Sequence, residues 1–109
     1  MTEHVSPPEL NAALDRLWQQ FLPQMDERVG TLEAAGRALT GGKLGDDERE
    51  AAKSAAHKLA GVLGTFGLTK GTILAREAEM MYSGDADPVS ATQLTGIAAQ
   101  LRSLIIGRT

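Results

Sequence analysis

Apolar residues recur at helical spacing along most of this chain. In the first run, Ser6 to Glu9 combines the spacing of a capping box with proline at the first helical position. Pro23 interrupts the run, because proline lacks a backbone donor and disfavours helical geometry at the residue before it. The pattern therefore predicts an N-terminal helix followed by a kink or short break. The apolar positions of this helix are Leu10, Ala13, Leu14, Leu17 and Phe21.

Four further helical runs follow, joined by short connections. The second begins at Met25 and ends at Gly41, where a glycine pair is typical of a helix C-terminus. The third opens with acidic residues from Asp46, which favour the positive end of a helix. The fourth covers residues 68–83, and the fifth follows Asp87. We expect the buried face of the fourth helix to consist of Ile73, Leu74, Ala78 and Met81.

These runs together predict the fold class. The chain has no alternating strand pattern, internal repeat or low-complexity segment. The predicted fold is all-α, an antiparallel four-helix bundle with an additional N-terminal helix. We expect residues 6–109 to form this single bundle and residues 1–5, which show no periodicity, to form a disordered tail.

One histidine stands out in the third predicted helix. At about 100° per residue, the apolar stripe from Ala52 to Phe66 faces the core, and His57 projects roughly 160° away from Leu59 at its centre. The imidazole is therefore expected to point into solvent. On the same line lie Glu50, Gly61 and Gly64.

The glycines beside His57 suggest a docking surface. Each costs a helix interior roughly 0.5–1 kcal/mol relative to alanine, whereas a missing Cβ on an exposed face lets another molecule approach closely. Gly61 and Gly64 are accordingly predicted to admit a partner protein. Lys53 and Lys58 are predicted to place positive charge near an anion attached to the imidazole. The alternative is a solvated helix face whose histidine is incidental.

The run His57-Lys-Leu59-Ala-Gly61-Val-Leu-Gly-Thr-Phe66-Gly67 resembles the signature of the histidine phosphotransfer (HPt) domains of bacterial phosphorelays. The resemblance is good over these residues and extends weakly to about Glu79. It implies an antiparallel four-helix bundle in which His57 is the phosphoacceptor, Gly61 admits a receiver domain, and Phe66 with Gly67 forms the packed end of the helix. Docking is expected to involve Glu50, Ala60, Gly61 and Gly64.

Two positions near His57 bear on its chemistry. Many members of the family carry a lysine three residues after the histidine, whereas this chain has Ala60 there and offers Lys53 and Lys58 instead. Self-phosphorylating histidine kinases, by family resemblance, place an acid directly after their histidine, and here that position is Lys58. No activating base is strictly required, because a neutral imidazole nitrogen is a competent nucleophile toward an acyl phosphate.

Composition and charge limit the partners and ligands that we expect for this chain. The formal net charge is −3 and no basic cluster is present, which argues against a nucleic-acid or anionic-membrane partner. No apolar run approaches the ~18 residues that span a bilayer, and the absence of cysteine fits a reducing, cytoplasmic compartment. The chain lacks a nucleotide-binding loop and a cluster of metal ligands. We therefore expect no kinase activity of its own, no cofactor and no metal.

Two classes of function remain. The first is a phosphorelay intermediate that accepts a phosphoryl group on His57 from a receiver-domain phosphoaspartate and passes it to another receiver aspartate. Its partners would be receiver domains of response regulators or hybrid histidine kinases, and it would act as a monomer. The second is a non-catalytic interaction bundle, or a degenerate HPt domain that docks receivers without phosphotransfer. The sequence leaves open which receivers are donor and acceptor, and whether the bundle belongs to a longer protein.

Overall fold

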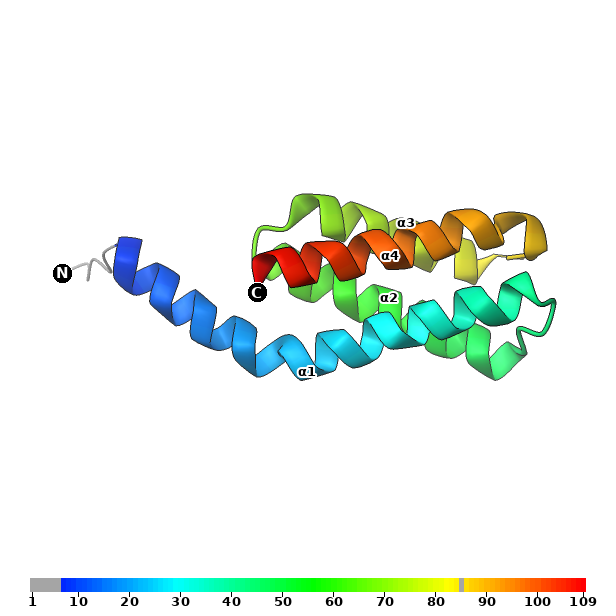
Figure 1. The fold of residues 1–109 in the computed structure, drawn as a ribbon, viewed down its shortest axis with the longest axis horizontal. Helices are drawn as coiled ribbons and strands as arrows, with labels where there is room; N and C mark the ends of the chain where they lie inside the picture. Colours follow the sequence, from blue (N-terminus) through cyan, green and yellow to red (C-terminus); the bar gives the residue numbers. More distant parts are fainter. Residues whose placement is uncertain (1–6, 85) are drawn as a thin grey trace.

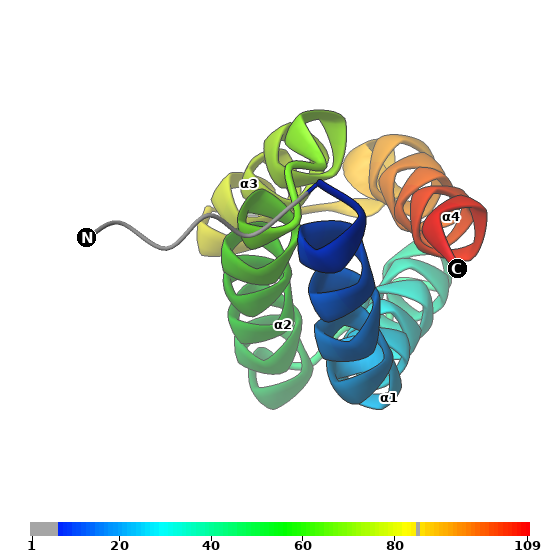
Figure 2. The same ribbon diagram turned by 90° about the vertical axis from the view of Figure 1, so that its left-hand side faces the viewer.

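The computed structural model describes residues 7–84 and 86–109, and these contain four α-helices around one core (Figures 1 and 2). Figure 2 looks along the bundle and shows α1 beside α2 and α4, with α3 completing the ring. The predicted all-α four-helix bundle is confirmed. The predicted tail of residues 1–5 lies outside the described residues. The elements are α1 (Pro7–Thr40), α2 (Asp46–Thr65), α3 (Thr69–Ser83), the short 3₁₀ helix η1 (Pro88–Ser90) and α4 (Ala91–Arg108).

Of the predicted kink or short break at Pro23, the break is wrong, because α1 continues through this residue. Figure 1 shows α1 bending between its blue and cyan parts without ending, and a proline inside a helix is a common cause of such a bend. Pro23 is exposed, while Trp18 and Met25 on either side of it are fully buried. Their packing offsets the local cost of the proline, about 3 kcal/mol in a helix interior. The additional N-terminal helix is therefore the first part of α1.

The N-terminal part of α1 extends beyond the other helices (Figure 1). Leu10 and Leu17, which belong to its predicted apolar stripe, are 49% and 37% exposed. Continuous packing begins at Trp18, whose ring meets Phe66 edge-on at 5.1 Å between centroids. Phe66 caps the end of α2, and Gly67 adopts a φ of 72°, a left-handed conformation that favours glycine. This aromatic contact ties α1 to the end of the helix that carries His57.

The buried face predicted for α3 is partly wrong. Ile73 is 60% exposed, and the face toward the core carries Gly71, Ala75, Ala78 and Tyr82. Small residues occupy this face because α3 packs closely on α2. A Cβ at Gly71 would stand only 3.0 Å from Leu63 Cδ1. The large aliphatic side chain of Ile73 is left on the surface.

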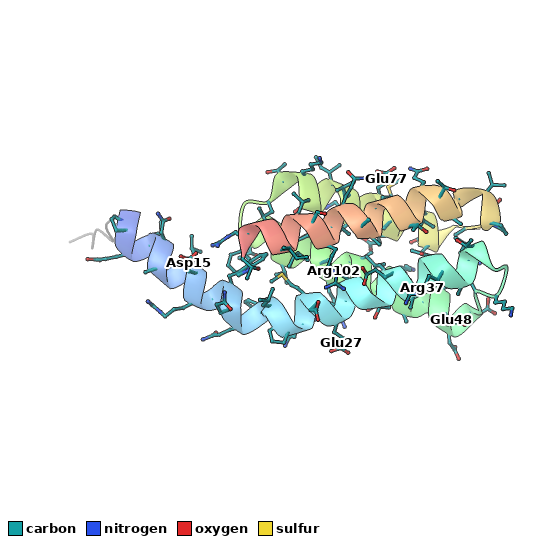
Figure 3. The ribbon with its side chains drawn as sticks, in the orientation of Figure 1. Asp15, Glu27, Arg37, Glu48, Glu77 and Arg102 are labelled. Carbon is teal, nitrogen blue, oxygen red and sulfur yellow. The ribbon has the colours of Figure 1, made fainter. Side chains whose placement is uncertain are left out.

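Charged side chains join α1 to α4, on the side of the bundle away from the contact between α2 and α3. Figure 3 shows Arg102 in the space between these two helices. Its Nη2 atom donates to Glu33 Oε1 at 2.6 Å, and its Nη1 atom donates to Asp26. The hydrogen bonds that Arg102 donates to Glu33 and Asp26 raise its pKa above the ordinary value, although partial burial opposes them. No described helix is long and apolar enough to cross a membrane.

Candidate functional site

His57 lies near the middle of α2, so the chain is helical on both sides of it. Its side chain is 73% exposed, and its Nδ1 atom lies 2.9 Å from Glu79 Oε2 of α3. Glu79 is more enclosed, with a side chain that is 27% exposed. The imidazole is thus held by a second helix while one of its edges remains open to solvent.

The partner of His57 determines which ring nitrogen is reactive. An ionised carboxylate accepts hydrogen bonds and donates none, so Nδ1 must carry the proton that lies between the ring and Glu79. In the neutral ring, the lone pair is then on Nε2. This arrangement presents a nucleophilic nitrogen toward solvent and fixes the orientation of the ring.

A surface groove of about 330 Å³ runs beside this pair, between α2 and α3. It is open enough to receive part of another molecule. Besides His57, its walls carry an acidic side chain, a cationic side chain and an exposed apolar side chain. Met80, at 75% exposure, stands on its α3 side. The lining residues are His57, Ala60, Gly61, Arg76, Glu79 and Met80.

The predicted docking residues occupy different positions around His57. Ala60 and Gly61 line the groove, and a Cβ added at Gly61 would meet no atom within 4 Å. Gly64 is exposed, and a Cβ there would stand 3.4 Å from Thr72 Oγ1. Glu50 is exposed two helical turns before His57, outside the groove. Their roles in docking remain predictions.

The structure does not bring the two predicted lysines into the groove. Lys58 lines a separate hollow on the α1 side of α2, together with Glu27 and Arg28. A step of about 100° per residue separates it from His57, which is enough to turn it toward another helix. Lys53 lies one turn before His57, half-buried, on the side away from Ala60 and Gly61.

Sequence reasoning missed the contribution of α3. Glu79, Arg76 and Met80 reach the groove from a helix that follows α2 after a short turn. Their spacing of three and four residues shows that they share a helix face, but the rotation of that face toward His57 depends on how α3 packs. A neighbouring acid of α3, Glu77, instead accepts a hydrogen bond from Gln93 of α4, and Figure 3 shows it on the side of α3 near α4.

Other parts of the surface offer less chemistry. Among the described residues, no three histidine, aspartate or glutamate side chains are grouped so that they could hold a metal ion. A larger groove of about 530 Å³ lies between α1 and α4, on the other side of the bundle. It is lined mainly by apolar side chains and aliphatic stems, and His57 is not part of it.

An exposed, oriented histidine on the face of a four-helix bundle defines a helical module that presents an imidazole to a partner molecule. The family model of the Hpt domain matches residues 16–106, so the chain belongs to the Hpt domain family. Its general role is therefore histidine phosphotransfer in a phosphorelay, a process in which Hpt domains interact with receiver domains.

The chain is also similar to the curated protein RcaC of Microchaete diplosiphon. The two are 38% identical over 73 residues, which cover 67% of this chain and 11% of that protein. The chain thus spans about a tenth of this relative's length. No solved structure matches the chain significantly.

Proposed function

We propose that His57 accepts a phosphoryl group from the phosphoaspartate of one receiver domain and passes it to the aspartate of another. The observation that carries this proposal is the 2.9 Å contact between His57 Nδ1 and Glu79 Oε2, which directs the reactive Nε2 outward. The site lies on rigid helices, so its geometry does not depend on a mobile loop.

The forward step forms a bond between His57 Nε2 and phosphorus while the bond from phosphorus to the aspartyl oxygen breaks. The electron pair of that bond leaves with the aspartate, which becomes a free carboxylate. The imidazole, now substituted on Nε2 and protonated on Nδ1, acquires positive charge. The carboxylate of Glu79 accepts the Nδ1 proton in a hydrogen bond and stabilises this charge.

Transfer to the second receiver reverses these events. Its aspartate attacks phosphorus, the bond to Nε2 breaks, and the neutral imidazole is restored with its proton still on Nδ1. Both linkages are energy-rich, so the step is reversible. Any metal ion in the reaction belongs to the receiver's own site.

Receiver docking is proposed over the groove between α2 and α3. Gly61 leaves open space beside His57, and Ala60 adds only a methyl group to the groove. Ile73 and Met80 lie two turns apart on α3, exposed by 60% and 75%, and offer apolar contacts next to the groove. Such an interface needs no residue of the α1–α4 groove.

The test incubates the protein with a panel of phosphorylated receivers and, separately, with ATP. We expect label from a receiver and none from ATP, and the product should be stable to base and labile to acid, as a phosphoramidate is. His57→Gln should abolish labelling and keep the helical circular dichroism spectrum, because the side chain is exposed.

Glu79→Gln provides the second arm of this test. The glutamine oxygen can still accept from Nδ1 but without charge, so the equilibrium yield of phosphohistidine should fall roughly tenfold. Glu77→Gln, on the same helix but bonded to Gln93, serves as the matched control and should transfer normally. If His57→Gln were labelled as well as the wild type, or no receiver labelled the wild type, the interaction bundle would be the better description.

A further inference from the structure

The groove beside His57 contains one acidic and one basic side chain. The acid, Glu79, is engaged with His57 Nδ1. The basic residue, Arg76, precedes Glu79 by one turn on the same face of α3, and its side chain is exposed. Within residues 7–84 and 86–109, Arg76 makes no hydrogen bond or ion pair. Its guanidinium group therefore has no structural role in the described part of the chain.

The other arginines of α2, α3 and α4 are all engaged. Arg49 donates to the backbone carbonyls of Gly84 and Ala86, which holds the chain after α3. Arg102 pairs with Asp26 and Glu33 of α1. Arg108 pairs with Asp15 and lies over the ring of Trp18. Arg76 differs from these three residues in lying beside the proposed nucleophile without a partner among the described residues.

The pairing of α2 with α3 places Arg76 opposite Ala60. The two helices are antiparallel, and their register is fixed by the His57–Glu79 contact and by the approach of Gly64 to Thr72. One turn back from Glu79 along α3 corresponds to one turn forward from His57 along α2. Arg76 and Ala60 accordingly line the same groove.

The surroundings of Ala60 leave room for the arginine side chain. Ala60 is small and only 5% exposed, and Gly61 next to it has no side chain. Lys58 lies in a different hollow, and Lys53 lies one turn away on the other side of His57.

We propose that Arg76 binds the phosphoryl group on His57, supplying from α3 the cation that α2 lacks at position 60. This inference rests on the proposed function of His57. A phosphoryl group on Nε2 would bring about two negative charges to the groove, across the imidazole ring from the carboxylate of Glu79, and the guanidinium group offsets the repulsion. Its planar arrangement of N–H donors also matches two phosphoryl oxygens at once.

The test uses phosphoramidate, a small donor that phosphorylates histidine without a receiver. At fixed phosphoramidate and ammonia, Arg76→Gln should lower the equilibrium ratio of phosphorylated to free protein roughly tenfold, equivalent to about 1.4 kcal/mol. Arg76→Lys should restore part of this loss, because it keeps the charge but not the planar fork. Lys58→Gln and Lys53→Gln are the matched controls and should change the ratio less than twofold.

A spectroscopic measurement separates direct contact from a structural role. On phosphorylation of the wild type, the Arg76 Nε–H resonance should shift strongly, and the phosphorus resonance should differ between the wild type and Arg76→Gln. An unchanged ratio and unchanged resonances in Arg76→Gln would overturn the inference. So would a larger loss in either lysine variant, or an effect of Arg76→Gln that is seen only when a receiver is present. If neither phosphoramidate nor any phosphorylated receiver labelled His57 in the wild type, the proposed function would be overturned, and the inference with it.

Discussion

The protonation of a single ring nitrogen connects this fold to its proposed chemistry. Because Glu79 accepts from Nδ1 of His57, the histidine keeps one tautomer before and after phosphoryl transfer. The carboxylate comes from α3, so the proposed nucleophile and its partner belong to two different helices. A change in the packing of α2 on α3 would therefore alter the orientation of the imidazole even if both residues were retained.

Tyr82, also on α3, carries a polar atom that the fold leaves unsatisfied. Its ring is 2% exposed, and its hydroxyl group is buried with no hydrogen-bond partner among the described residues. This burial raises the pKa of Tyr82 above its ordinary value, an effect that the charge of Arg49 partly opposes. The folded state therefore holds the phenolic proton more tightly than the unfolded state does.

Tyr82→Phe should consequently stabilise the protein. Removing the unsatisfied hydroxyl group should raise the free energy of unfolding by about 1 kcal/mol at neutral pH. Because the pKa of Tyr82 is raised in the folded state, its contribution to the free energy of unfolding is fully present below about pH 10 and is lost as the pH rises further. The free energy of unfolding of the wild type should therefore fall more above that pH than that of the variant. Urea denaturation at neutral pH and above pH 10 measures both effects, and equal slopes with pH would contradict the assignment to Tyr82.

At the scale of the helix, α2 has a buried stripe of apolar residues and an exposed side that does not take part in packing the bundle. The buried side carries Ala52, Ala56, Leu59 and Leu63, all fully enclosed. On the exposed side, Gly61 leaves open space directly beside the groove. The helix thus accepts the conformational cost of glycine at a position where its own packing does not require one.

Gly61→Gln should make stability and function change in opposite directions. The free energy of unfolding should rise by up to about 1 kcal/mol, since glutamine is the better helix former. Phosphoryl transfer from a receiver should fall at least tenfold, because the new side chain occupies the groove beside His57. Gly30→Gln on α1 is the matched control, since a Cβ there also meets no atom within 4 Å. Normal transfer by Gly61→Gln would show that the open space is not used for docking.

The helices differ in how well their sequences predicted them. The face of α2 was predicted correctly because large residues such as Leu59 and Leu63 recur on it at helical spacing. On α3 the large aliphatic residue Ile73 is exposed, while Gly71 and Ala75 are buried and Gly71 approaches Leu63 of α2. Hydrophobicity alone therefore pointed to the wrong rotation of α3. The same rotation decides that Glu79 and Arg76 face His57, so these two site residues could not be assigned from sequence.

Helix α1 is also more continuous than the conformational preferences of its own residues predict. Pro23 disfavours a helix in any isolated segment, yet Trp18, which anchors α1 before it, contacts the other end of the chain. Trp18 Nε1, for example, donates to Thr109 Oγ1 at 3.1 Å. Contacts over such a separation cannot be read from a local pattern.

At the scale of the whole molecule, the chemistry and the main charge cluster occupy different sides of the bundle. His57 and Glu79 belong to the α2–α3 side, whereas Arg102 joins α4 to α1 (Figure 3). These two sides share a core but no described polar contact joins His57 to Arg102. We therefore expect that stability can be altered on one side without changing the proposed reacting groups on the other.

Arg102→Leu should test this separation. Loss of the guanidinium group leaves Glu33 and Asp26 without their partner, which should lower the free energy of unfolding by roughly 1–2 kcal/mol in urea denaturation. Phosphorylation of His57 should be unchanged under conditions where the variant remains folded. Arg37→Leu, an exposed residue of α1, is the control and should cost less than about 1 kcal/mol. A change in labelling of Arg102→Leu would show that the two sides are coupled.

The pairing of α2 with α3 has a consequence for the order in which the protein opens and refolds. His57 and Glu79 are separated by 22 residues, whereas the pairs that join α1 to α4 are separated by 69 or more. Closing a short loop costs less chain entropy than closing a long one, so the helical hairpin can re-form while α1 and α4 are still apart. In Arg102→Leu, amide exchange should accordingly rise in α1 and α4 before it rises in α2 and α3. The hairpin would then retain the paired imidazole and carboxylate through partial unfolding events that separate the rest of the bundle.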